Sequence, residues 1–252
     1  IHHAPRTLAP TRPPIKQDRP RQIGLSNRRP PAYDGNMPRQ DFRHVKTWVF
    51  DLDNTLYPPS ARLFDQIEAK MTDWVMARLQ VGRDHADQLR RHYWALYGTT
   101  LAGLMAEHDI APGEYLSAVH DIDFSPLLPD PVLAGRLAAL PGRRIVHTNA
   151  DAAYARRVLK ARGLADLFDA IYGVEETLFH PKPARAAFDA VLAADGLDPG
   201  SAAMFEDDPR NLAVPHDLGM RTVHIAPERL EAPHIHHHAE DLSEFLARLV
   251  ES

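Results

Sequence analysis

Short apolar runs recur along the chain, and the first of them ends abruptly at Asp51. The runs cover residues 45–50, 144–147, 170–172, 202–205 and 222–225. Short apolar runs rich in β-branched and aromatic residues are typical of buried parallel strands. Helical patterns lie between the runs at 131–140, 151–162, 183–194 and 209–218, and an amphipathic helical pattern follows at 240–250. This alternation predicts an α/β fold with a doubly wound parallel sheet.

The stretch from residue 57 to residue 130 breaks the alternation. It contains no convincing strand, and apolar residues recur at helical spacing over 60–80, 84–106 and 112–120. We interpret 57–130 as an all-helical cap inserted after the first strand, which leaves 44–56 and 131–252 as the α/β core. A cap at this position is expected to cover the carboxyl ends of the strands, where α/β sheets bind their ligands.

The charge of the chain is divided unevenly. The 252 residues carry a formal net charge of −5 and include 22 prolines. Residues 1–43 hold eight of these prolines together with nine Lys or Arg and three Asp, so this leader carries +6 and the remainder −11. A segment so rich in proline, without apolar periodicity, is expected to be disordered. We interpret residues 1–36 as sequence upstream of a natural start at Met37, and the alternative is a basic arm for an anionic partner.

The composition argues against several classes of function. Because the chain has no cysteine, a disulfide scaffold, a Cys-based zinc site and a thiol nucleophile are all excluded. No apolar run approaches the ~18 residues of a membrane span, and the leader lacks the apolar core of a secretion signal. We therefore expect a cytoplasmic protein without a membrane partner. The acidic body argues against nucleic acid as the main partner.

Four segments at predicted strand ends carry the residues that indicate chemistry. Residues 48–56 (WVFDLDNTL) place two aspartates, one residue apart, after the first apolar run. The other segments are 145–149 (IVHTN), 181–183 (PKP) and 204–211 (MFEDDPRN). Taken singly, each has an ordinary structural explanation, such as an Asp-rich turn or a helix N-cap. The hydroxyl and backbone N–H groups at 148–149 would also suit an anion at the start of a helix.

In this order and at these strand ends, the four segments resemble the haloacid dehalogenase-like hydrolase superfamily over residues 45–250. The resemblance implies that Asp51 attacks phosphorus, and that Asp53 protonates the leaving oxygen and then activates water. It implies Mg²⁺ as the cofactor, held by Asp51, the backbone carbonyl of Asp53, and Asp207. Since dehalogenases do not need the second aspartate as an acid, Asp53 favours a phosphatase.

The same resemblance assigns further residues to the site. Glu206 and Asn211 are expected at water-mediated positions around the metal. Thr148 and Lys182 are expected to act in catalysis, and the phosphate is expected to contact Asn54, Thr148, Asn149 and Lys182.

The charges of this site require compensation whatever the family. Asp51, Asp53, Glu206 and Asp207 would bring up to four negative charges beside a phosphate dianion. Repulsion between like charges at close range is too strong to leave uncompensated in a buried site. A divalent cation and Lys182 together would supply three positive charges, so the acidic body is compatible with a phosphorylated substrate.

Two segments of the expected cap indicate the substrate. Residues 54–58 (NTLYP) and 97–104 (YGTTLAGL) are similar to the pyrimidine 5′-nucleotidase branch of the superfamily. We therefore expect a small-molecule phosphate ester, a pyrimidine nucleoside 5′-monophosphate, as the substrate. Aromatic candidates to stack on its base are Tyr57, Tyr93, Trp94 and Tyr97, although aromatic residues at helical spacing more often pack in a core.

Other functions stay open at this point. The alternatives are a small-metabolite phosphatase, acting on phosphoglycolate or a sugar phosphate, and a non-catalytic phosphate- or nucleotide-binding module of the same fold. The oligomeric state is also open, with a homodimer as one option.

A group of histidines lies close to the C-terminal helical pattern. His234, His236, His237 and His238 fall in a predicted loop, far along the sequence from the acidic residues. We expect adventitious nickel or zinc binding at these histidines rather than a physiological metal site.

Overall fold

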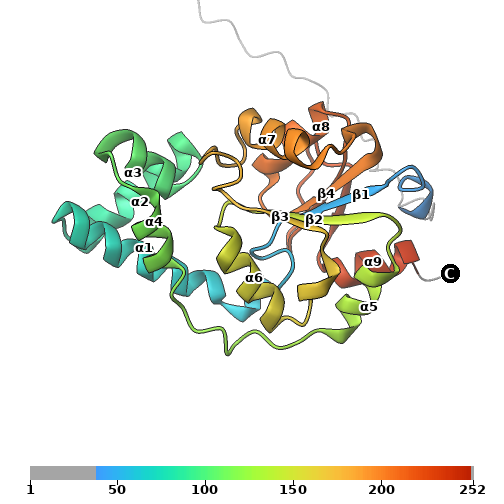
Figure 1. Cartoon of the computed structure of the whole chain (residues 1–252), viewed down its shortest axis with the longest axis horizontal. Coiled ribbons are helices and arrows are strands. Elements are labelled where there is room, and N and C mark those ends of the chain that lie inside the picture. The colour runs from blue at the N-terminus through green and yellow to red at the C-terminus, as the bar shows by residue number, and fades with distance from the viewer. Residues whose placement is uncertain (1–37, 251–252) are drawn as a thin grey trace, which may run out of the picture. The chain divides into compact units, whose positions relative to one another are not determined.

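The computed structural model describes residues 38–250, which form an α/β fold around a parallel sheet (Figure 1). The sheet has six strands in the order β3-β2-β1-β4-β5-β6, and all neighbouring strands are parallel. The strands are β1 (Thr47–Phe50), β2 (Arg143–His147), β3 (Ala170–Tyr172), β4 (Ala202–Glu206), β5 (Arg221–Ile225) and β6 (His237–Ala239). The predicted doubly wound parallel sheet is therefore confirmed.

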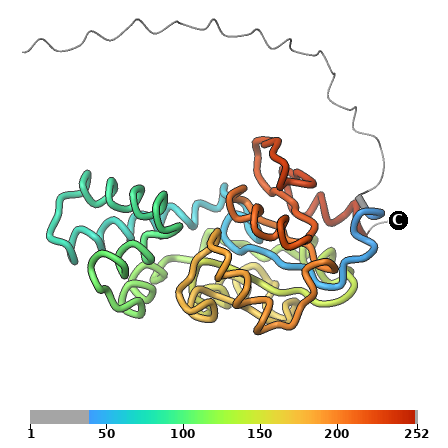
Figure 2. Tube along the Cα trace, turned by 90° about the horizontal axis from the view of Figure 1, so that it is seen from above, coloured from blue at the N-terminus to red at the C-terminus, as the bar shows by residue number. Residues whose placement is uncertain are grey.

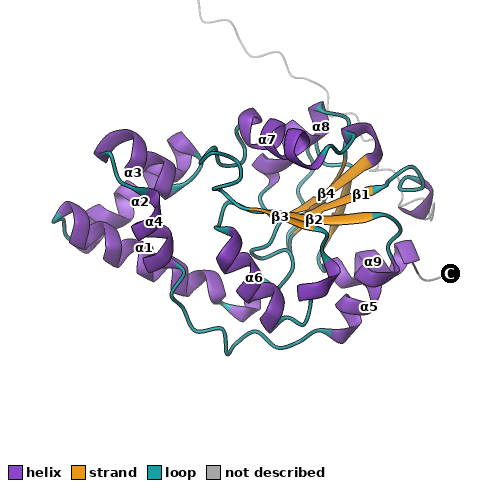
Figure 3. Ribbon diagram, in the orientation of Figure 1, coloured by secondary structure: helices purple, strands orange, loops and turns teal. Residues whose placement is uncertain are grey.

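Helices cover both faces of the sheet (Figure 3). One face is covered by α7 (Arg185–Asp195) and α8 (Ala213–Asp217), and the other by α5 (Pro131–Ala139), α6 (Ala152–Ala161) and α9 (Leu242–Val250). The buried residues form two clusters, because alternate residues of a strand point to opposite faces. Trp48, Phe50 and Phe205 belong to the cluster on the α9 side, and Val49 and Met204 to the cluster on the α7 side.

Four helices lie between β1 and β2 in the sequence. They are α1 (Leu63–Leu79), α2 (Arg83–Tyr97), α3 (Thr100–His108) and α4 (Pro112–Val119), and we call this group the helical insert. In Figure 2 they form a group beside the sheet and its covering helices. The helical pattern over 84–106, which one long helix or a pair would explain, forms a pair, because Gly98 ends α2 with a positive φ of +88°.

Short 3₁₀ helices complete the described chain. They are η1 (Pro38–Gln40), η2 (Pro59–Ala61), η3 (Ala165–Leu167), η4 (Pro199–Ser201) and η5 (Pro209–Leu212). None of the helices within residues 38–250 has the length and hydropathy needed to cross a bilayer.

The structure differs from the sequence prediction at both ends of the described chain. The predicted leader falls outside the described residues up to residue 37, but Phe42, which the prediction assigns to it, is buried. Its ring stacks on Trp48 at a centroid distance of 6.0 Å, so the core begins before residue 44. The predicted histidine loop contains a strand, β6, because His237–Ala239 pairs with β5.

Candidate active site

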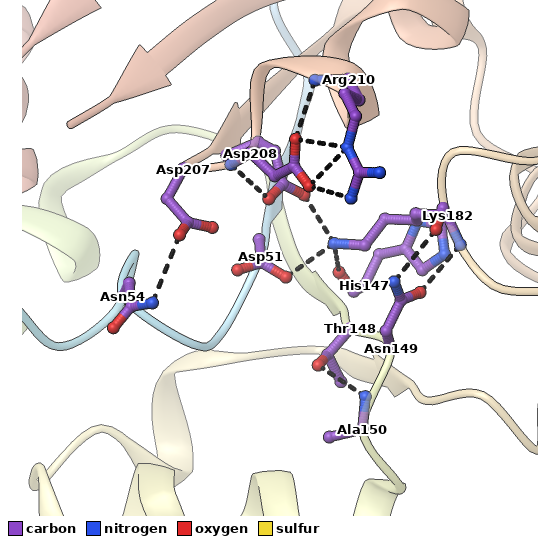
Figure 4. A network of polar contacts seen from close by, with 11 residues as sticks. Asp51, Asn54, His147, Thr148, Asn149, Ala150, Lys182, Asp207, Asp208 and Arg210 are labelled. Carbon is purple, nitrogen blue, oxygen red and sulfur yellow. Dashed lines mark hydrogen bonds and ion pairs between the residues drawn. The ribbon is translucent and has the colours of Figure 1, made fainter. Parts of the chain in front are cut away.

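The predicted site residues meet at the carboxyl ends of three neighbouring strands. Asp51 follows β1 directly, and its backbone N–H donates to the carbonyl oxygen of Phe205 on β4 at 2.9 Å. Thr148 follows β2, while Glu206 is the last residue of β4 and Asp207 comes next. Because β1 lies between β2 and β4, these side chains lie together at the carboxyl edge of the sheet, where the strands end (Figure 4).

Lys182 reaches into this edge from the loop before α7. Its Nζ atom donates to Asp51 Oδ1 at 2.6 Å, to Glu206 Oε2 at 2.6 Å and to the carbonyl oxygen of His147 at 2.8 Å. The side chain is buried, with 1% of its surface exposed. Burial lowers the pKa of Lys182, but the Asp51 and Glu206 carboxylates outweigh burial and raise this pKa above its ordinary value. Lys182 is therefore a fixed positive charge between two carboxylates.

Three carboxylates gather beside this ammonium group. Oxygen atoms of Asp51, Glu206 and Asp207 all lie within 4.8 Å of one another. Burial, followed by the charge of Glu206, raises the pKa of Asp51 to about 8 and that of Asp207 to about 9. An all-oxygen set of this kind suits a hard divalent cation, whose charge would relieve the repulsion that Lys182 leaves uncompensated.

Glu206 already has partners for both of its carboxylate oxygens. Oε2 accepts from Lys182, and Oε1 accepts from the backbone N–H of Asp208 at 3.1 Å. Asp207 is bound more loosely, since its Oδ2 accepts from Asn54 Nδ2 at 3.4 Å. Asp51 and Asp207 therefore have more capacity left for a metal ion than Glu206 does, and Glu206 holds Lys182 in place.

The Asp53 side chain makes a different set of contacts from those of Asp51. Its Oδ1 atom accepts hydrogen bonds from the hydroxyls of Tyr57 at 2.6 Å and Tyr154 at 2.8 Å. Burial raises the pKa of the Asp53 carboxyl, while the two hydroxyl donors act in the opposite direction. Tyr57, predicted as a stacking partner for a base, is 1% exposed and is engaged with Asp53. That prediction is wrong, because the Tyr57 ring is enclosed in the core.

The residues that were expected to contact the phosphate have two different roles in the structure. Thr148 is buried, and its Oγ1 atom accepts from the backbone N–H of Ala150 at 3.1 Å, which leaves its own hydroxyl proton to donate. The Asn149 side chain instead holds the Lys182 backbone, donating to its carbonyl at 3.1 Å and accepting from its N–H at 2.8 Å. Asn149 therefore orients Lys182 through its side chain. Asn211 lines the same cavity as these residues, and its buried Oδ1 atom has no partner among the described residues.

A cavity of about 740 Å³ connects this edge to the helical insert. Insert residues that line it include Phe64, Ile67, Met71, Arg91, Trp94 and Tyr115. Tyr97 does not line it, and its hydroxyl donates to Glu107 at 3.0 Å. Tyr93 is buried with its hydroxyl 2.7 Å from His108 Nε2. Of the four aromatic candidates, Trp94 alone faces this cavity, and the predicted substrate contact of Tyr97 is wrong.

Several contacts around the site could not be predicted from the sequence. Tyr154 lies in the first turn of α6, next to its N-cap Asp151, and contacts Asp53 across 101 residues of sequence. His120 Nδ1 lies 2.6 Å from Asp151 Oδ2, and Arg210 places its guanidinium 3.5 Å from the centroid of the Trp94 ring. An aspartate directly before a helical pattern, such as Asp151, is a sequence signal for an N-cap. Contacts between residues that lie far apart in the sequence leave no such signal.

The histidines near the C-terminus do not form a metal cluster in the described part of the chain. His236 Nδ1 accepts from the backbone N–H of Thr222 at 3.1 Å, and His238 Nδ1 lies 3.3 Å from His224 Nδ1. Within residues 38–250, only Asp51, Glu206 and Asp207 bring three candidate metal ligands together.

Comparison with known proteins finds proteins that are similar in sequence and others that are similar in structure. A family model described as haloacid dehalogenase-like hydrolase matches residues 45–219. "Phosphate metabolism protein 8" of Saccharomyces cerevisiae is 29% identical over 181 residues, which cover 65% of this chain and 56% of the yeast protein. The match therefore spans little more than half of that relative's length.

Solved structures show the same fold at low sequence identity. A HAD phosphatase from Thermococcus onnurineus is 19% identical, with a TM-score of 0.57, and the match covers 82% of this chain and 98% of that one. The HAD-hydrolase YfnB from Bacillus subtilis, bound to magnesium, is 15% identical with a TM-score of 0.52, over 82% and 99% of the two chains. A 2-haloacid dehalogenase from Pseudomonas syringae pv. Tomato is 24% identical with a TM-score of 0.51, over 81% and 99%. These structures share the fold with this chain and differ in their chemistry, so the site residues decide the reaction.

Proposed function

Because the chain belongs to the haloacid dehalogenase-like hydrolases, we propose that it is a Mg²⁺-dependent phosphomonoesterase that works through an aspartyl-phosphate on Asp51. The observation that carries the proposal is the second carboxyl group, Asp53. It follows the nucleophile by two residues and is held in place by two hydroxyl donors. A phosphatase needs such an acid for the ester oxygen, whereas displacement of halide from carbon does not.

The proposed reaction has two steps. First, a carboxylate oxygen of Asp51 forms a bond to phosphorus, the bond from phosphorus to the ester oxygen breaks, and the ester oxygen keeps the electron pair and takes a proton from Asp53. Second, water attacks the phosphorus and gives a proton to Asp53. The bond from phosphorus to Asp51 breaks, which releases inorganic phosphate and restores the Asp51 carboxylate.

Residues around Asp51 orient the nucleophile and offset charge. Lys182 occupies Oδ1 of Asp51, which leaves Oδ2 for the attack. The Thr148 hydroxyl and the backbone N–H groups that follow it are the donors proposed for the phosphoryl oxygens. Asp51, Asp207 and the backbone carbonyl of Asp53 are the proposed Mg²⁺ ligands, with Glu206 and Asn211 close by. When bound, Mg²⁺ supplies positive charge that offsets the carboxylates and the transferred phosphoryl group.

We propose a pyrimidine nucleoside 5′-monophosphate as the substrate. The similarity of residues 54–58 and 97–104 to the pyrimidine 5′-nucleotidase branch supports this substrate, as does a cavity with room beyond the phosphate. Trp94 offers the flat face on this cavity that Tyr57 and Tyr97 do not. The name of the yeast relative, which refers to phosphate metabolism, agrees with a phosphate ester.

A phosphate-release panel tests the proposed function. UMP and CMP with Mg²⁺ should release phosphate faster than phosphoglycolate or a sugar phosphate, and EDTA should stop the release. Replacement of the nucleophile in Asp51→Asn should lower kcat at least ~10³-fold, because the amide cannot form the acyl phosphate. Faster turnover of phosphoglycolate would contradict the nucleotide assignment, and full activity of Asp51→Asn would contradict the mechanism.

A further inference from the structure

Two tyrosine hydroxyls converge on a single oxygen of Asp53. Tyr57 lies in the loop after β1 and Tyr154 in the first turn of α6, so the two side chains come from distant parts of the sequence. Their hydroxyls lie 2.6 Å and 2.8 Å from Asp53 Oδ1. Both rings are buried, with 1% and 0% of the residue surface exposed. Neither tyrosine lines the cavity, so the substrate does not reach their hydroxyls.

Tyr154 is itself held by a buried pair. Asp151 Oδ1 accepts from the Tyr154 backbone N–H at 2.6 Å, and Asp151 Oδ2 lies 2.6 Å from His120 Nδ1. The His120 ring stacks on the Tyr154 ring with centroids 4.4 Å apart and planes 18° apart. The ring of Tyr154 therefore has little freedom, and its hydroxyl is directed at Asp53. Tyr57 is held instead by the core that encloses its ring.

The hydrogen-bond pattern distinguishes the two oxygens of Asp53. Each tyrosine hydroxyl has one proton to donate, and each has Asp53 Oδ1 as an acceptor within hydrogen-bond distance. While Oδ1 accepts both hydrogen bonds, it does not carry the acidic proton as well. The proton that a general acid carries is therefore borne by Oδ2.

We infer that Tyr57 and Tyr154 are positioning residues, which hold Asp53 so that Oδ2 is the oxygen that exchanges protons with the reacting groups. This inference rests on the proposed function. In the first step, the proton passes from Asp53 Oδ2 to the ester oxygen as its bond to phosphorus breaks. In the second step, the attacking water returns a proton to Oδ2. Oδ1 keeps its two hydrogen bonds throughout.

The positioning role predicts a substrate-dependent defect in phenylalanine variants. Tyr57→Phe and Tyr154→Phe keep the buried ring and remove one donor each, so the Asp53 carboxyl loses its fixed orientation. An alkyl phosphate such as UMP has a poor leaving group and depends on the acid, whereas p-nitrophenyl phosphate has a good leaving group and does not. We expect kcat/KM for UMP to fall about 10-fold in each variant and about 100-fold in the double variant, a fraction of the full effect of a general acid.

The experiment compares the two substrates on one preparation of each variant with Mg²⁺. The ratio of the two kcat/KM values does not depend on how much of the sample is folded, so a loss of stability alone cannot produce the expected result. Because kcat/KM reports the steps up to release of the alcohol, it isolates the transfer to Asp51 from the later hydrolysis. For p-nitrophenyl phosphate we expect a change of less than about 3-fold, since this step needs no acid.

Tyr172→Phe is the matched control. Its hydroxyl also donates to a carboxylate, Asp195 Oδ2, at 3.1 Å, but Tyr172, on β3, does not line the cavity. Both kcat/KM values should match the wild type in this control. Equal losses for UMP and p-nitrophenyl phosphate in Tyr57→Phe and Tyr154→Phe, or no loss for either, would overturn the positioning role. If the wild type turns over neither substrate, the proposed function fails, and the inference fails with it.

Discussion

At the scale of single residues, Lys182 holds the candidate site together electrostatically. It contributes one positive charge to a group of three carboxylates, and it binds the two buried ones, Asp51 and Glu206, at 2.6 Å. The His147 carbonyl accepts from the third Nζ–H, so the ammonium group has partners for all of its protons. Removing one partner of a buried ion pair leaves the other charge uncompensated, which costs more than the pair contributes.

Lys182→Met should therefore destabilise the fold and abolish most of the activity. We expect the free energy of unfolding to fall by about 3–5 kcal/mol in EDTA, because Asp51 and Glu206 lose their buried partner. Mg²⁺ should recover part of this loss, since it binds the folded state and offsets the same carboxylates. Denaturant unfolding with EDTA and with Mg²⁺ measures both effects, and kcat should fall at least ~10²-fold.

The control for this prediction is an exposed lysine. Lys70 lies 3.9 Å from Asp121 with 46% of its side chain exposed, so Lys70→Met should change stability by less than about 0.5 kcal/mol. Lys182→Met with wild-type stability in EDTA would show that the carboxylates do not depend on this cation.

At the scale of elements, the turn between α2 and α3 rests on the loop that carries Lys182. Gly98 ends α2 with φ +88°, and a Cβ atom built there would lie 3.1 Å from the carbonyl oxygen of Lys182. The same carbonyl accepts from Asn149, so the Lys182 segment is held between the end of β2 and the helical insert. The helix end and the catalytic loop therefore share one tightly packed contact.

Gly98→Ala should lower activity beyond its cost in stability. Gly196 provides the comparison, because it also ends a helix in the left-handed region (φ +74°), but a Cβ atom added there would have nothing within 4 Å. Both changes to alanine should cost on the order of 1 kcal/mol through backbone strain. Crowding of the Lys182 carbonyl should additionally lower kcat about 10-fold in Gly98→Ala, because small displacements of catalytic groups reduce the rate strongly.

Thermal unfolding and steady-state kinetics on the two glycine variants measure these effects. Equal activity in Gly98→Ala and Gly196→Ala, with equal losses of stability, would show that the α2–α3 turn does not influence Lys182.

At the scale of the described molecule, side chains join the helical insert to the α/β core around the cavity in two further places. His120, at the end of α4, lies 2.6 Å from Asp151 at the start of α6. Arg210, in η5 after the Asp207 loop, places its guanidinium on the face of Trp94, and its Nη2 atom lies 2.6 Å from Asp208 Oδ2. The second contact connects the wall of the cavity to the loop that carries Asp207.

Trp94→Leu should weaken substrate binding more than it slows the chemical step. The substitution removes the flat face on the cavity and the cation–π contact, each worth about 1 kcal/mol, so we expect KM for UMP to rise about 5- to 30-fold. The change in kcat should be small, because Trp94, on the cavity wall, contacts Arg210 rather than the reacting carboxyl groups. Leu96→Ala, on the same helix with 61% of its surface exposed, is the control and should leave both constants unchanged. A fall in kcat at constant KM would place Trp94 in the chemistry instead.

Much of this molecule follows from its sequence, and the exceptions have physical reasons. Strands such as β1 and β4 are apolar runs that are buried along their whole length, so pattern and burial agree. β6 was missed because its residues, His237–Ala239, are mainly polar and form a strand only through pairing with β5. Phe42 was missed because it lies among charged and proline residues, and only the folded core shows where its ring packs.

Part of the candidate site could also be predicted from the sequence. Asp51 and Asp207 could be placed together because parallel strands end at one edge of the sheet, and Lys182 was added by the resemblance of its segment to the family. The sequence could not show that Tyr57 serves Asp53 rather than a base, because an aromatic residue next to the site fits either role. Tyr154 and Arg210 depend on contacts between distant helices and loops, for which a single sequence has no local signal.

Covalent catalysis by Asp51 can be tested by trapping the phosphorylated intermediate. Acid quenching during turnover of p-nitrophenyl phosphate with Mg²⁺, followed by peptide mass spectrometry, locates a transferred phosphoryl group. We expect one phosphoryl group on the peptide that contains Asp51 in the wild type and none in Asp51→Asn. A phosphoryl group on another residue, or none on this peptide in rapidly quenched enzyme that is turning over substrate, would contradict covalent catalysis by Asp51.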